Sequence, residues 1–164
     1  MRYQRPVIHL TGCQPRNLAS LMELYDSSYK RMMRLAPDLQ RIPTNSVSRV
    51  AGSLDLHLTV LERFKYTTTV ALTYRFRADG EPILEPNVQV RLYHDARLAE
   101  AVSDARRHRI RPTHRCGRRE LPTELERKWE QNRFLQRWLG YCLRQGHLFL
   151  NFSESSAARA DLIV

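Results

Sequence analysis

The sequence is poor in the residues that build phosphate cradles, disulfide frameworks and membrane spans. Its 164 residues include only 6 glycines and 3 cysteines, and no apolar run approaches the 18 or so residues that cross a bilayer. Glycine-rich nucleotide loops and the serine elbow of hydrolases are absent from the sequence. Three widely spaced cysteines do not make the dense, even set of a secreted disulfide scaffold. We therefore expect reduced thiols, no membrane contact and no cofactor.

One short stretch near the N-terminus resembles a signal for a lipid anchor. Leu10-Thr11-Gly12-Cys13 looks like the small-residue box before a lipidated cysteine. A signal segment places a longer apolar stretch ahead of its cleavage site than this chain has there. The sequence therefore predicts a cytoplasmic protein.

Positive charge is what the sequence has in excess. There are 27 lysine and arginine residues against 17 aspartate and glutamate, a formal net charge of +10 at pH 7. Only 3 of the 27 are lysines, a bias that a GC-rich genome also produces. Hydrophobic residues make up 42% and charged residues 27%, as in a soluble globular domain. A surplus of this size favours an acidic partner.

Hydrophobic periodicity predicts two helices, one near each end of the chain. The first begins after Asn17, whose side chain can cap a helix, and ends before Pro37, since proline pushes the preceding residue out of the helical region. The second runs over residues 123–145, with apolar side chains at steps of three and four. Gly146 suits the left-handed residue that follows a helix.

Between the helices the pattern changes to that of strands. Apolar and polar residues alternate over 54–60, 66–77 and 88–93, as in strands with one buried face. Residues 97–103 form a fourth strand or start a helix, and 148–150 could add an edge strand. Short connections predict an antiparallel meander, and the prolines at 82 and 86 place the intervening residues in a loop.

These elements predict an α+β fold, an antiparallel sheet of three to five strands with the N- and C-terminal helices packed on one face. Residues 17–152 form the single domain, between an irregular segment at 1–16 and a flexible tail at 153–164, and 104–120 is a basic loop within it. The predicted core consists of Tyr25, Met32, Leu54, Leu56, Leu58, Val70, Leu72, Leu92, Trp129, Leu135, Trp138 and Leu139. On the second helix the apolar stripe also includes Leu125, Phe134, Tyr141, Cys142 and Leu143.

Three strings carry a resemblance to a known family: VRLYHDA at 90–96, RFKYTTTV at 63–70 and FLQRWLGYCLRQG at 134–146. They resemble the YqiB-like family of small uncharacterised proteins of gammaproteobacteria. The resemblance extends from Leu21 to Phe152 and implies a bacterial cytoplasmic protein, with no activity, cofactor or catalytic residue to carry over. The basic loop and the tail are its least family-like parts.

The candidate catalytic residues are His94, Asp95 and Cys116. A His-Asp pair suggests metal or acid–base chemistry, but no other histidine stands at a matching ligand spacing. His94 also continues a buried strand face, which favours a hydrogen-bonded histidine at the rim of the core. Cys116 lies among arginines that would lower the pKa of its thiol. His114 and Cys116 are too close in sequence for a usual zinc site, so we expect no metal.

The basic loop is the strongest functional signal. Its seven arginines could neutralise several phosphates and make binding depend on salt. On the sheet face opposite the core, two strands should present more arginines and an aromatic side chain for stacking on bases. The candidate polyanion-binding residues are thus Arg75, Arg77, Arg91, Tyr93, Arg106, Arg107, Arg109, Arg111, Arg115, Arg118 and Arg119.

The sequence leaves three functions open. The leading hypothesis is a non-enzymatic binding or regulatory module whose basic surface takes up nucleic acid or another polyanion. An adaptor for an acidic protein is the first alternative. An enzyme that uses His94 and Asp95 is the second.

Overall fold

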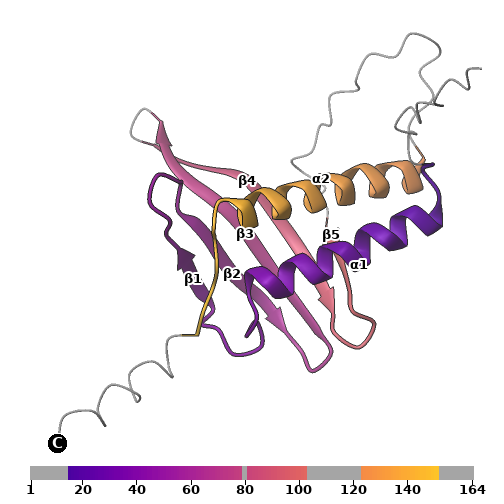
Figure 1. Cartoon of the computed structure of the whole chain (residues 1–164), viewed down its shortest axis with the longest axis horizontal. Helices are drawn as coiled ribbons and strands as arrows, with labels where there is room; N and C mark the ends of the chain where they lie inside the picture. The colour runs from indigo at the N-terminus through magenta and orange to yellow at the C-terminus, as the bar shows by residue number, and fades with distance from the viewer. Residues whose placement is uncertain (1–14, 79–80, 103–122, 152–164) are drawn as a thin grey trace, which may run out of the picture.

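The computed structural model describes residues 15–78, 81–102 and 123–151, and it describes no side chain over 77–78 and 81–84. The order of elements is helix, five strands, helix (Figure 1). Most of the predicted N-terminal segment, the basic loop at 104–120 and the tail at 153–164 lie outside the described residues.

The five strands form one antiparallel sheet in the order of the sequence, β1-β2-β3-β4-β5. Their bounds are β1 Asn45–Ser48, β2 Leu56–Arg63, β3 Thr67–Ala78, β4 Glu81–Tyr93 and β5 Leu98–Val102. Each strand pairs antiparallel with the next strand in the sequence, as the alternation and the short connections predicted. The register pairs Leu58 with Leu72 and Val70 with Val90, so the apolar residues of neighbouring strands line up on one face.

The two helices, α1 (Leu18–Leu35) and α2 (Glu124–Arg144), cover that face and run in the same direction (Figure 1). Asn17 caps α1, as predicted, and Thr123 caps α2. Each cap residue accepts the backbone N–H three positions on, and the side chain at that position bonds back to the cap, which satisfies two backbone donors at each helix start.

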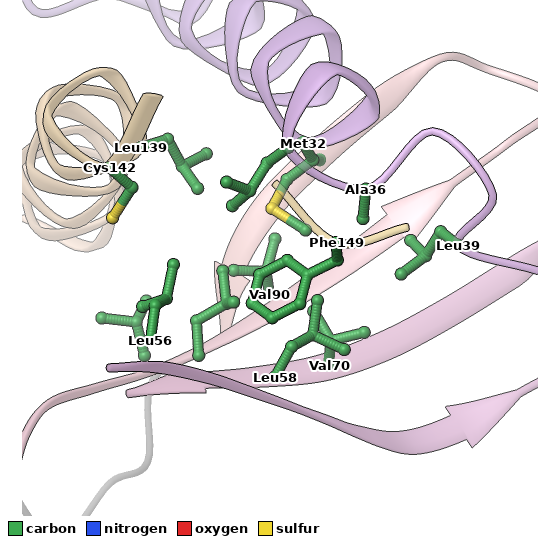
Figure 2. Packing of buried hydrophobic residues seen from close by; sticks show 14 of the residues in the cluster. Met32, Ala36, Leu39, Leu56, Leu58, Val70, Val90, Leu139, Cys142 and Phe149 are labelled. Carbon is green, nitrogen blue, oxygen red and sulfur yellow. The ribbon is translucent and has the colours of Figure 1, made fainter. Parts of the chain in front are cut away.

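The core lies between the sheet and the helices (Figure 2). Leu139 and Cys142 of α2 and Met32 of α1 point toward Leu56 and Leu58 of the sheet, and all five side chains are fully buried. Burial of a large apolar side chain contributes about 1.5–3 kcal/mol. The α+β fold predicted from the sequence is therefore confirmed, and it rests on this layer.

A second, smaller cluster joins the helices at their N-terminal halves. Trp129 packs there against Leu21 and Leu24, and its indole N–H donates to Ser20 Oγ at 2.9 Å. Half-buried Tyr25 borders this cluster. The prediction that Trp129 packs against the sheet was wrong, because its ring is buried in this cluster between the two helices. Tyr25 does reach the sheet, since its hydroxyl donates to Glu100 of β5 at 3.3 Å.

Several strand predictions were also wrong. The sequence pattern did not indicate β1, which is only four residues long and carries no clear alternation. It placed the prolines of 79–86 in a loop, whereas β4 begins at Glu81 and includes Pro82 and Pro86, the latter after a cis peptide bond. Residues 148–150 form no strand. Instead Phe149 is buried, and its N–H donates to the Leu35 carbonyl at 2.8 Å.

Four residues of the predicted core are exposed. Leu54 precedes β2 and is 50% exposed, since β2 begins only at Leu56. On α2, Leu125, Phe134 and Tyr141 belong to neither buried cluster and are 36%, 44% and 45% exposed. The buried side of α2 is narrower than its apolar stripe because Leu135, Leu139 and Cys142 fill the contact.

Candidate anion-binding site

The face of the sheet away from the helices carries the strand residues predicted to bind a polyanion. Of its two arginines with described side chains, Arg75 is exposed. Arg91 lies 3.9 Å from a carboxylate oxygen of Glu62 and bonds to Thr69. Arg77 lies in β3, but its side chain is outside the described part. This face therefore has mixed charge.

Tyr93, the aromatic residue predicted for this face, is engaged by a carboxylate. Its hydroxyl donates to Glu100 Oε1 at 2.8 Å, while Tyr25 donates to the other oxygen. Lys128 lies 3.7 Å from that second oxygen. Burial, and then the bond to Glu100, raises the pKa of Tyr93. The phenol thus ties β4 to β5 beside a negative charge, which disfavours a phosphate there.

His94 joins three elements at the rim of the core. Its Nε2 lies 2.9 Å from Thr68 Oγ1 and its Nδ1 lies 3.3 Å from the hydroxyl of Tyr29. Burial lowers the pKa of His94, against a smaller opposing effect of the exposed Asp95. Both ring nitrogens thus have hydroxyl partners. Within the described ranges, no three His, Cys, Asp or Glu side chains gather where they could hold a metal ion.

The remaining predicted residues fall outside the described part of the chain. They are Arg106, Arg107, Arg109, Arg111, Arg115, Cys116, Arg118 and Arg119. The structure therefore does not describe where they lie relative to the arginines of the sheet.

A cluster that the sequence did not predict lies between the C-terminal halves of the helices. Arg31 and Arg34 of α1 and Arg144 of α2 line a pocket of about 240 Å³, together with Gly140 and Leu143. The guanidinium group of Arg31 crosses to α2 and donates to the main-chain oxygen of Gln136. We call this site the arginine pocket.

Gly140 makes the arginine pocket possible. A Cβ at this position would lie 2.5 Å from Nη1 of Arg31 and 3.3 Å from Nη1 of Arg144. Two guanidinium nitrogens therefore approach one point on the surface of α2. These two nitrogens are thus no more than about 6 Å apart, where two unit charges repel by at least about 0.7 kcal/mol in water-like surroundings. An anion held between them would remove that repulsion.

The charges of the arginine pocket are balanced by no carboxylate among the described residues. The ion pairs found there join other residues, such as Arg16 with Glu130 and Arg127 with Glu124. Arg34 and Arg144 lie in the last turns of their helices, where the partial negative charge of the helix ends favours cations. This effect favours Arg34 and Arg144 at these positions without acidic partners and leaves their donors available to a ligand.

A comparison with known protein families matches a range of the chain that includes residues from both helices of the arginine pocket. The sequence profile of the family described as "Protein of unknown function (DUF1249)" matches residues 31–148. The chain belongs to this family. The matched range includes Arg31, Arg34, Gly140 and Arg144.

Relatives of the family agree with the resemblance found in the sequence. The chain is 32% identical to "Uncharacterized protein YqiB" of Escherichia coli strain K12 over 126 residues. The aligned region covers 77% of this chain and 88% of the relative. The proteins of the same name from strains O6:H1 and O157:H7 give the same values. The predicted YqiB-like membership is confirmed. No solved structure matches the chain significantly.

The arginine pocket could not be predicted from the sequence because the residues that line it from the two helices are more than 100 positions apart in the chain. Arg31 and Arg34 share a helix face, yet nothing in the sequence indicates which residues of the second helix meet them. One signal was present. A glycine in the interior of a helix costs about 1 kcal/mol relative to alanine and usually has a packing reason, and here that reason is the approach of Arg31 to Gly140.

Proposed function

We propose that the protein is a non-enzymatic binding module that takes up phosphate-bearing polyanions, nucleic acid above all, at the arginine pocket. The observation that carries the proposal is the set of three arginines around one hollow, with no carboxylate partner among the described side chains. Guanidinium groups present paired donors whose geometry matches phosphate oxygens. The net charge of +10 supports the proposal, because it attracts polyanions from a distance.

The arginine pocket replaces the sheet face as the favoured contact. On the sheet, Arg91 and Tyr93 already have carboxylate partners, and a phosphate would compete with them. In the pocket, Arg34 and Arg144 are exposed and need no rearrangement. The arginines of 104–120 would add to the same positive field.

A cytoplasmic location is also proposed. Neither helix of the described chain is long and apolar enough to cross a membrane. Cys142 is a free, buried thiol that contacts the hydroxyl of Tyr74 at 3.5 Å. A free thiol in the core suits a reducing compartment.

The test measures the salt dependence of binding. Wild type and Arg34→Gln/Arg144→Gln are titrated against fluorescent single-stranded RNA and DNA and against inorganic polyphosphate at several salt concentrations. Each phosphate of a single strand that an arginine no longer neutralises lowers the slope of log K against log salt by about 0.7. The double variant should therefore lower the slope by about 1.4.

A matched control is Arg97→Gln/Arg127→Gln, which removes the same charge from exposed arginines outside the pocket. Arg127 lies about 25 Å from Arg144 along α2. The control should keep the wild-type slope. No binding of any polyanion at low salt would overturn the proposal, and so would equal slopes for the two double variants. Binding of polyglutamate in place of RNA, DNA and polyphosphate would also overturn it, in favour of an adaptor for acidic proteins.

A further inference from the structure

One face of α2 presents aromatic and arginine side chains in alternation beside the arginine pocket. Phe134, Arg137, Tyr141 and Arg144 follow one another at steps of three, four and three residues, which places them in one row along a helix. All four are exposed, Phe134 by 44% and Tyr141 by 45%. We call this row the α2 stripe. It extends over about 15 Å and shares Arg144 with the pocket.

The fold does not need the aromatic rings of the α2 stripe. Leu135, Leu139 and Cys142 supply the contact of α2 with the core, and Phe134 and Tyr141 belong to neither buried cluster. Single exposed apolar residues are ordinary. Two exposed rings one heptad apart, each followed after three residues by an arginine, form a pattern that packing does not explain.

The arginines of the α2 stripe have no acidic partner among the described residues. The ion pairs found there include neither Arg137 nor Arg144. Glu130, one turn before Phe134, binds Arg16. The stripe therefore offers two positive charges without acidic partners and two partly exposed rings, which match a ligand that carries both phosphates and flat rings.

We infer that the ligand of this surface is single-stranded nucleic acid, whose bases stack on Phe134 and Tyr141 while its phosphates contact Arg137, Arg144 and the arginine pocket. The inference rests on the proposed function and specifies its substrate. The two ring positions lie about 10 Å apart along the helix, so each ring can stack on a different base of the same strand. Stacking on aromatic side chains requires unpaired bases and tolerates any sequence. A duplex keeps its bases inside and gains only the phosphate contacts.

The test replaces the rings and keeps every charge. The variant Phe134→Leu/Tyr141→Leu retains apolar side chains and good helix formers but has no ring to stack on. The matched control, Phe64→Leu/Tyr66→Leu, removes two rings from the turn between β2 and β3, where they are 63% and 54% exposed. A rescue variant, Phe134→Trp/Tyr141→Trp, restores flat rings at the stripe.

The probes are a 12-nucleotide single-stranded RNA, the corresponding duplex and inorganic polyphosphate, each titrated with the full chain. For the leucine variant of the stripe, affinity for the single strand should fall at least tenfold, while affinity for polyphosphate and the salt slope should stay at wild-type values. The control should bind like wild type. The tryptophan variant should recover most of the affinity for the single strand.

The outcomes separate this inference from the proposed function. If no polyanion binds, both fail. If polyphosphate binds and the leucine variant holds the single strand like wild type, the stacking inference alone is overturned. An equal decrease in affinity for polyphosphate and RNA in that variant would also overturn it. A sedimentation result in which wild type is a dimer and the leucine variant is a monomer would overturn it as well, because the stripe would then join two copies of the chain.

Discussion

Replacing Gly140 with alanine is expected to weaken anion binding while changing the stability of the fold only slightly. The new Cβ would lie 2.5 Å from Nη1 of Arg31, closer than such atoms can approach. The clashing atom is the far end of a flexible side chain, so the guanidinium group moves away rather than the helices. Arg31 would then lose its bond to the Gln136 carbonyl and its place in the arginine pocket.

The effect on stability is small because two contributions oppose each other. Alanine in a helix interior is more favourable than glycine by about 0.5–1 kcal/mol. A hydrogen bond from a charged group contributes about 1.5–3 kcal/mol, toward the lower end here because Arg31 is only half-buried. The free energy of unfolding should therefore change by less than about 2 kcal/mol. Affinity for polyphosphate should fall roughly tenfold or more, since one charge-assisted hydrogen bond to the ligand can no longer form.

The assay combines urea unfolding with polyphosphate titration of Gly140→Ala. Gly146→Ala is the matched control, because Gly146 follows α2 with φ of 88° and a Cβ there would meet only Val50, at 3.9 Å. Alanine at this left-handed position is strained by about 1–2 kcal/mol, so the control should lose stability and keep its affinity. Wild-type affinity in Gly140→Ala would refute the assignment of Arg31 to a binding site.

Three further predictions concern the fold. Leu139→Asp buries an unpaired carboxylate in the core, and circular dichroism should find the domain unfolded at room temperature; a cooperative melt near that of wild type would contradict the core described above. Burial lowers the pKa values of His94 and His147, so the folded state favours their neutral forms. Their stabilising contribution is full above about pH 6.5 and is lost as the pH falls through their lowered pKa values. Urea midpoints should accordingly drop between pH 7.5 and 5.5, and a midpoint that rises would speak against neutral, buried imidazoles. Thr123→Ala removes the hydroxyl that accepts the Glu126 N–H and donates to the Glu126 carboxylate; it should cost about 0.5–2 kcal/mol, measured by urea unfolding against the exposed-site control Arg137→Gln.

The sequence predicted elements well where local physics decides them. Asn17 accepts the backbone N–H of Ser20 at 2.9 Å, and Gly146 adopts a positive φ, both as their residue types indicate. It failed where tertiary contacts decide. Pro82 has the residue type of a loop, yet β3 provides a partner for the strand on which it lies.

The candidate site followed the same division. A positive net charge is visible in composition, but the pairing of Arg91 with Glu62 and the freedom of Arg34 depend on which side chains meet in space. The apolar stripe on the second helix correctly predicted the burial of Leu135, Leu139 and Cys142. It wrongly included Phe134 and Tyr141, because periodicity does not tell how much of a helix its neighbours cover.

The contact of Asn132 with β5 has a consequence for how this protein behaves in a crowded solution. Asn132 is 1% exposed, and its Oδ1 accepts the N–H of Ala101 at 2.8 Å, so a helix side chain occupies a main-chain donor that another strand would need. Unprotected outer strands are the usual starting point of cross-chain β polymerisation. The other edge strand, β1, is only four residues long, so it offers few main-chain groups for pairing with a second chain. Loss of the Asn132 amide should therefore promote fibrillar aggregates that grow from the β5 side.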